Sequence, residues 1–239
     1  MNEKGMPLLH GRDESREMRC MTRCYAIILA AALLAMSKEV VGQQTGEALT
    51  HFNHVATGFT GAPGGRGLVV TTAIEVNTAM MYANFAAGNP TNLDAMKTNV
   101  RSVLHAVVPE LGAKGPGLGF GVKRAAEAMV THIELAEKSP GASETLRKLG
   151  PAVAQAGRAV AARAQEMADL GKRVLAAQTA AQAAPLVDEL RALALQLDLG
   201  RDANGNGQIE VNAIEPGMNQ LEAQVYSIFE GDRLPRVLR

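Results

Sequence analysis

One short stretch near the C-terminus places oxygen-bearing residues at alternate positions. Within "RDANGNGQIEVNAIE" they are Asp202, Asn204, Asn206, Gln208 and Glu210. Hard cations such as Ca²⁺ need six to eight oxygen ligands, and a tight turn supplies them when every second residue carries one. The spacing therefore predicts a cation site.

The stretch resembles the calcium-binding loop of an EF-hand, with a helix on either side over residues 185–230. The five oxygen donors match the first, third, fifth, seventh and ninth positions of that family, Gly207 its sixth and Ile209 its apolar eighth. The twelfth position holds a bidentate Glu in the family but Ala213 here, which removes two oxygens and one negative charge. Glu215 is the candidate replacement if the turn into the last helix swings inward.

The resemblance implies weak Ca²⁺ binding, with a dissociation constant of about 0.1 to 1 mM or weaker. It also implies a structural role rather than a switch, because sensor EF-hands usually come in pairs and this sequence contains one such loop. The alternative interpretation is a turn that keeps the shape without an ion.

The four histidines that follow the first 42 residues offer a second kind of metal chemistry. His51 and His54 are three residues apart on an expected helix, so their rings share one face, and His105 and His132 lie on two later helices. Helical bundles assemble metal sites from such facing side chains. On a helical wheel His105 points away from the apolar stripe of its helix and His132 lies at the edge of its own, which predicts that at least one faces solvent unless another helix covers it. A transition-metal or haem site is therefore the alternative function, and surface histidines are the competing interpretation.

No arrangement of residues in the sequence predicts catalysis. The spaced glycines of "GPGLGFG" (115–121) lie between helices, without the preceding strand of a nucleotide-binding loop. The patterns Cys-x-x-Cys-His, His-Glu-x-x-His and Glu-x-x-His are absent from the sequence. The protein is thus predicted to be non-catalytic, and an enzyme of unidentified kind is the third reading.

The elements that must position these residues are helices. Apolar residues recur at spacings of three and four, and clusters of Gly and Pro divide the chain into segments. The expected helices cover residues 46–57, 68–87, 92–107, 120–138, 143–177, 179–197 and 216–229. With no segment that reads as a strand, this pattern predicts an all-α antiparallel helical bundle that ends in the EF-hand-like helix-loop-helix.

The apolar stripes predict which side chains form the core. In the long Ala-rich helix an almost heptad stripe, interrupted by Arg163, is expected to form the central seam, and its small residues leave room for a helical homodimer. That stripe comprises Val153, Ala156, Val160, Met167, Leu170, Val174 and Ala177. The stripe of the helix over residues 68–87 comprises Val70, Ile74, Met81 and Phe85. Those of the other helices are Leu49, Phe52 and Val55 or Ala56; Leu93, Met96, Val100, Val103 and Val107; Val122, Ala126, Met129 and Ile133; and Leu186, Leu190, Leu193 and Leu197.

The first 42 residues read as an upstream extension followed by an export signal. Arg19 and Arg23 precede an apolar run, Tyr25–Met36, that is too short for the roughly 20 residues of a membrane-spanning helix. Small residues then allow cleavage after Ser37 or Gly42. A buried N-terminal helix is the alternative, but the basic flank and the polar exit favour export to the periplasm or the medium.

The composition of the remaining domain, residues 43–239, excludes several classes of function. Both cysteines, Cys20 and Cys24, precede it, which excludes disulfides and thiol catalysis in the cleaved chain. Its net charge is near −1 and it lacks Trp, so nucleic acid is not an expected partner. The sequence resembles exported bacterial helical proteins and predicts an exported helical bundle that binds Ca²⁺ weakly, spans no membrane after cleavage, and takes a protein partner or a second copy of itself.

Overall fold

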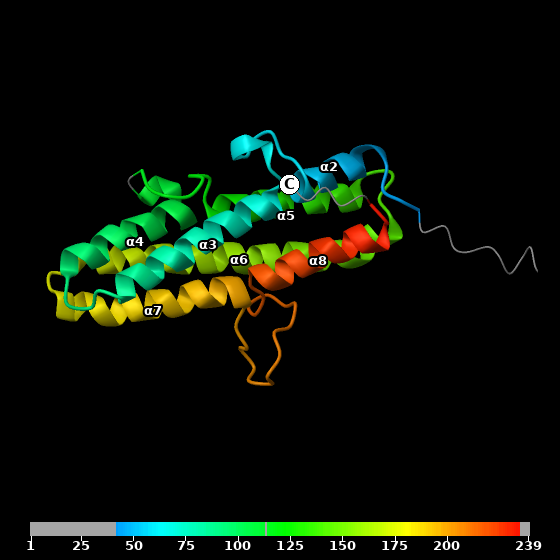
Figure 1. Ribbon diagram of the computed structural model, residues 1–239. Helices are drawn as coiled ribbons and strands as arrows, with labels where there is room; N and C mark the ends of the chain where they lie inside the picture. Colours follow the sequence, from blue (N-terminus) through cyan, green and yellow to red (C-terminus); the bar gives the residue numbers. More distant parts are fainter. Residues whose placement is uncertain (1–41, 113, 235–239) are drawn as a thin grey trace, which may run out of the picture. The chain divides into compact units, whose positions relative to one another are not determined.

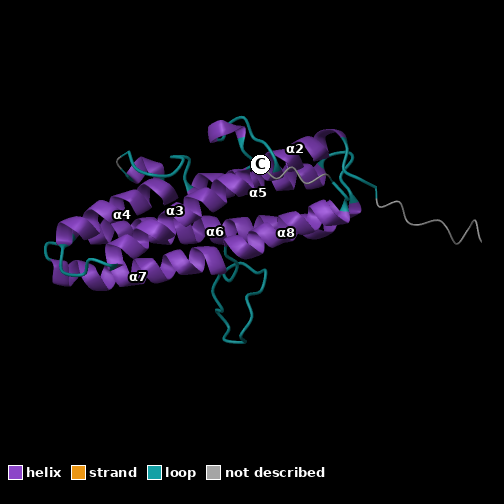
Figure 2. Cartoon of the chain, in the orientation of Figure 1, coloured by secondary structure: helices purple, strands orange, loops and turns teal. Residues whose placement is uncertain are grey.

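The computed structural model describes residues 42–112 and 114–234, and within them every regular element is helical (Figure 1 and Figure 2). Two 3-10 turns, η1 (Pro63–Gly65) and η2 (Pro109–Leu111), lie in the connections. The α-helices are α2 (Gly46–Ala56), α3 (Leu68–Ala87), α4 (Leu93–Val107), α5 (Val122–Lys138), α6 (Glu144–Ala176), α7 (Ala180–Leu199) and α8 (Met218–Gly231). The predicted all-α bundle is confirmed, whereas the expected export signal falls almost entirely outside the described residues.

Helix α6 is the spine of the bundle, and α4, α5, α7 and α8 all pack along it. Ser143 begins this helix by accepting a hydrogen bond from the Leu146 N–H at 2.9 Å. The approach of α5 is close, since a Cβ at Gly157 would lie 2.7 Å from Val130 Cγ2. The predicted seam is buried, as its residues Val153, Ala156, Val160, Met167, Leu170, Val174 and Ala177 show.

The stripes predicted for α4 and α5 also lie in the core, except that Leu93 at the start of α4 is half-buried and packs against it. Eight side chains of these two stripes are fully buried, and seven of the eight are larger than Ala. Each helix therefore has one well-defined inner face. The buried residues are Met96, Val100, Val103 and Val107 on α4, and Val122, Ala126, Met129 and Ile133 on α5. Sequence periodicity therefore identified the correct side of both helices.

The inward face predicted for α3 is wrong. Met81 is 44% exposed and Phe85 50% exposed, and Val70 and Ile74 are half-buried. The face that enters the core is made of smaller residues, which are Leu68, Val69, Val76, Ala79, Ala83 and Ala86. Glu75 is the single charged residue of this helix, so its apolar residues surround the axis and their spacing does not identify one side.

Residues 200–217 form the connection between α7 and α8, which projects from the bundle as the loop at the bottom of Figure 1. Its two ends meet where the Arg201 N–H donates to the Glu215 carbonyl at 2.8 Å. Gly200 permits this closure, because its φ of 87° favours glycine and a Cβ there would lie 2.7 Å from the same carbonyl oxygen. The loop thus leaves and re-enters the bundle at one place.

Arg163 of α6 lies inside the bundle and binds the backbone where the two ends of the α7–α8 connection meet. The residue is 3% exposed. Its guanidinium donates to the carbonyls of Gln196, Pro216 and Ile214 at 3.0, 2.8 and 2.6 Å. The charged interruption of the apolar seam is therefore the anchor of the α7–α8 connection, a role that its position in the sequence alone does not reveal.

Candidate metal centre

Helix α2 carries two of the three residues that form the centre. His51 and His54 are one turn apart and share the side of α2 that contacts α5. The neighbouring side of the same helix enters the core through Phe52, whose ring centroid lies 5.1 Å from that of Phe229 on α8. Because Phe52 fixes the rotation of α2, the two imidazoles face α5 and are half-buried.

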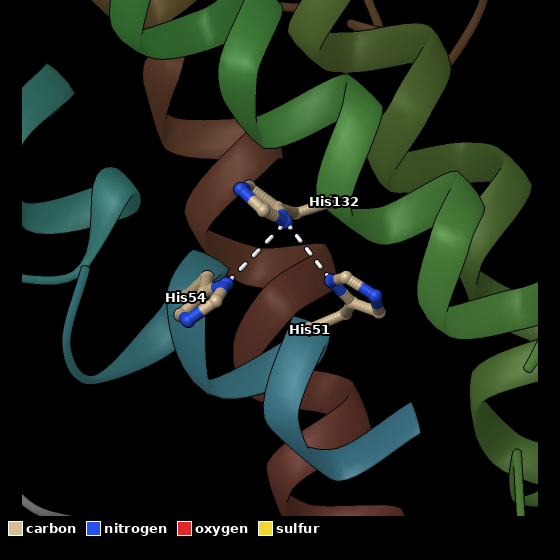
Figure 3. Close-up of side chains that lie close together, drawn as sticks. All are labelled: His51, His54 and His132. Atoms are coloured by element: carbon tan, nitrogen blue, oxygen red, sulfur yellow. Dashed lines mark hydrogen bonds between the residues drawn. The ribbon is translucent and has the colours of Figure 1, made fainter. Parts of the chain in front are cut away.

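Helix α5 supplies the third residue, His132. Its Nδ1 lies 3.1 Å from Nδ1 of His51 and 3.4 Å from Nδ1 of His54, as the dashed lines in Figure 3 show. One ring nitrogen from each histidine falls within 4.8 Å of those of the other two, and all three side chains are half-buried. Within residues 42–112 and 114–234, this is the one group of three or more His, Cys, Asp or Glu side chains with such convergent ligand atoms.

The convergence of three ring nitrogens has a simple chemical consequence. A nitrogen of neutral imidazole carries either one proton or one lone pair, so Nδ1 of His132 can complete one good hydrogen bond but not two. A cation between the rings resolves this conflict because all three nitrogens then present lone pairs. Two tetrahedral ligands at about 2.0 to 2.1 Å from a metal are roughly 3.3 Å apart, and the two observed separations lie on either side of that value.

The surroundings of the cluster favour neutral imidazoles. Burial, and then the nearby charge of His54 and of His51, lower the pKa of His132 below its ordinary value of 6.5. Burial and His51 likewise lower the pKa of His54. The Phe59 ring packs against both, with centroids 5.3 Å from His54 and 5.2 Å from His132. Neutral rings are the form that binds a metal ion.

These pKa shifts predict how the metal-free protein responds to acid. Since the pKa values of His54 and His132 are lowered on folding, the folded chain binds fewer protons than the unfolded chain between the folded-state pKa and 6.5. The stability that these two neutral rings permit is therefore fully present above pH 6.5, and it is lost as the pH falls through their folded-state pKa values. We expect the free energy of unfolding, measured with urea in EDTA, to decline as the pH drops from 7.5 to 5.

A His132→Gln variant isolates this effect from other titrating groups. Burial raises the pKa of Asp198, and burial and Asp198 raise that of Glu222, so these carboxyls act in the opposite direction at lower pH. They are unchanged in the variant, and the difference between the two stability curves therefore reports on the cluster. If the free energy of unfolding depended on pH in the same way in the parent and the variant, the histidine cluster would not be the source of the acid sensitivity.

The fourth candidate histidine, His105, lies elsewhere, beneath the glycine-rich connection that precedes α5. It is half-buried, and a Cβ at Gly119, where φ is 67°, would lie 3.2 Å from its Nε2. Glu75, which is fully buried, accepts the N–H groups of Phe120 and Gly121 at 2.9 and 3.1 Å. The spaced glycines therefore serve to pack a loop over side chains of α3 and α4, and His105 does not join the histidine cluster.

The first three predicted calcium ligands, Asp202, Asn204 and Asn206, lie on the exposed loop, where their side chains accept hydrogen bonds from the loop backbone. Asp202 accepts the N–H groups of Gly205 at 2.7 Å and Asn206 at 3.2 Å through Oδ1, and that of Gly207 at 2.7 Å through Oδ2. The Gly207 N–H first, and the others with it, hold the pKa of Asp202 below its ordinary value. Asn204 accepts from the Asn206 N–H at 2.9 Å. The first predicted ligand thus already organises the turn.

The later positions of the loop are bound in the same way. Asn206 accepts the Gln208 N–H at 2.8 Å and donates to the Glu210 carboxylate at 3.0 Å. Glu215 is 1% exposed, and its Oε2 accepts the Glu210 N–H at 2.8 Å. The side chain of Glu215 therefore does turn back into the loop, whereas Ala213 at the twelfth position is exposed and offers no side-chain oxygen.

Comparisons with protein families, with curated proteins and with solved structures find no match for this chain. Among the helices of the described residues, none combines the length and the apolar character that crossing a membrane requires.

Proposed function

We propose that this protein binds one divalent transition-metal ion through His51, His54 and His132. The observation that carries the proposal is the convergence of three ring nitrogens from two helices, at separations of 3.1 and 3.4 Å from the nitrogen of His132. The rotation of α2 and the packing of α5 against it bring these nitrogens together, so the fold of the two helices itself orders the ligands. Preorganisation of this kind raises affinity.

The donor set defines the class of metal. Imidazole nitrogen suits Zn²⁺, Cu²⁺ and Ni²⁺, whereas Ca²⁺ and Mg²⁺ prefer oxygen. Because the pKa values of His54 and His132 are lowered, these two ligands lose few protons when an ion enters, which favours binding near neutral pH. In this proposal the bundle is a non-catalytic metal-binding protein that is exported, the latter on the basis of its N-terminal sequence.

Calorimetric titration of the full chain with Zn²⁺ at pH 7.5 tests the proposal. A Cys20→Ser and Cys24→Ser background removes both thiols of the sequence as competing ligands. We expect one ion per chain. Loss of an outer-shell partner of a metal ligand costs about 10- to 100-fold in affinity, so loss of a ligand in His132→Ala should cost at least about 100-fold.

His105→Ala is the matched control, because it removes an imidazole from a neighbouring helix without touching the cluster. Its affinity should equal that of the parent. Equal affinity of His132→Ala and the parent would overturn the proposal.

A second candidate function, weak Ca²⁺ binding by the α7–α8 loop, is supported by the inward turn of Glu215. Together with Asp202 and Glu210 it gives the loop three carboxylates, which partly offsets the missing twelfth ligand. Thermal unfolding in EDTA and in 10 mM Ca²⁺ tests this site. With a dissociation constant near 1 mM the ion should add about 1.4 kcal/mol. The gain should vanish in Asp202→Ala, and a parent that shows no gain would contradict the proposal.

A further inference from the structure

Three nitrogen donors do not complete the coordination of a transition-metal ion. Zn²⁺ and Co²⁺ take four ligands in tetrahedral sites, and sites with three protein ligands leave the fourth position to water or another molecule. Within the described residues, no further His, Cys, Asp or Glu joins His51, His54 and His132. The described residues therefore supply three of the four ligands, and His51, His54 and His132 are called the tripod below.

The charge of a bound ion would also remain uncompensated by these ligands. The imidazole ligands are neutral when they bind a metal, and within the described residues no Asp or Glu belongs to the group. A site built from one Asp or Glu and two His would cancel part of the double positive charge, whereas this one does not. Such a centre attracts an anion to its open position.

The side chain packed beside the tripod does not fill that position. Phe59, which follows α2, lies with its ring 5.3 Å from that of His54 and 5.2 Å from that of His132. An aromatic ring carries no lone pair for a metal, but it replaces water near the ion, and charges attract each other more strongly where water is excluded. All three histidines keep partial exposure, so a small ligand can reach the ion.

We infer that the metal bound by His51, His54 and His132 keeps an open coordination position that takes a small monodentate anion. The ligand class comprises anions that bind through one atom, such as azide, thiocyanate or a carboxylate oxygen. This inference rests on the proposed metal binding and adds a second ligand to it, so that ion, protein and anion form a ternary complex.

Cobalt substitution provides the test, because the visible absorption of Co²⁺ reports both its binding and the ligands around it. The full chain is loaded with one equivalent of Co²⁺ and then titrated with sodium azide at constant ionic strength. We expect a Co²⁺ band that is absent in His132→Ala and retained in His105→Ala, and a shift of this band that saturates at one azide per ion.

The outcomes separate the two proposals. Absence of any His132-dependent band means that the tripod binds no metal, and the proposed function itself fails. A His132-dependent band that azide leaves unchanged up to 100-fold excess means that the coordination is closed, and the inference of an open position fails alone. A His10→Ala, Cys20→Ser and Cys24→Ser chain tests whether the first 41 residues close it. A response confined to that variant would overturn the inference for the full chain.

Discussion

Replacing Arg163 with Met is expected to lower the free energy of unfolding by about 3 to 5 kcal/mol. The substitution keeps the apolar stem but removes the donors that bind three carbonyls, those of Gln196, Ile214 and Pro216. Hydrogen bonds to a charged group contribute about 1.5 to 3 kcal/mol each, and a buried acceptor left without a donor carries a further penalty. The effect is large because one side chain secures both ends of the α7–α8 connection.

Two variants make the Arg163 prediction specific. Arg163→Lys keeps the positive charge but not the planar fork, so it should restore part of the lost stability. Arg158 lies on the same helix with its side chain 57% exposed and pairs with Glu134. Arg158→Met should therefore change the free energy of unfolding by about 0 to 1 kcal/mol. Equilibrium unfolding in urea measures the stability of all three variants. An Arg163→Met protein as stable as the parent would show that Arg163 does not anchor the connection.

Local patterns in the sequence predicted the helices well because each depends on neighbouring residues. The helix expected over residues 179–197, for example, is α7 (Ala180–Leu199), whose N-cap Thr179 accepts the Gln182 N–H at 3.2 Å. The α3 face failed for a physical reason. Periodicity identifies a buried side only when polar residues mark the other side, and α3 carries Met81 and Phe85 outward with no exposed charge beside them.

The sequence predicts one part of the histidine cluster, the pair on α2, but not the position of its third member. The spacing of His51 and His54 placed both on one face of a helix, which the structure bears out in the contacts that both make with His132. The third member lies 81 residues from His51 and 78 from His54, and its orientation depends on α2 covering the edge of α5. A helical wheel places a residue relative to its own helix, so it cannot show that another helix covers His132.

The role of Arg163 is hidden for a related reason. A charged residue within an apolar stripe interrupts the pattern, and the sequence around it offers no acceptor for its five donors. The carbonyls that bind it are 33 to 53 residues away, and they belong to the last turn of α7 and to the connection that follows it. Backbone acceptors carry no signature in side-chain type, so this anchor becomes visible only when the chain is folded.

Zn²⁺ is expected to stabilise the folded chain strongly at pH 7.5 and not at pH 5. At a free concentration 100 times its dissociation constant, an ion that binds only the folded state adds about 2.7 kcal/mol to the free energy of unfolding. The three imidazoles must be neutral to bind it, and protons compete for the same nitrogens as the pH falls. The pKa values of His54 and His132 are lowered, so protons compete less at these two rings than at ordinary imidazoles, and the gain should disappear as the pH falls to 5.

Thermal melts in EDTA and in Zn²⁺ at each pH measure this gain, and the variants show where it arises. His132→Ala should show no gain at either pH, whereas Asp202→Ala, which alters the exposed loop, should keep the full gain at pH 7.5. A gain of equal size at pH 5 would point to oxygen ligands, since carboxylates stay ionised there. Loss of the gain in Asp202→Ala would move the ion from the histidines to the loop. The gain from Zn²⁺ should therefore be lost in His132→Ala and kept in Asp202→Ala, whereas any gain from Ca²⁺ should be lost in Asp202→Ala and kept in His132→Ala.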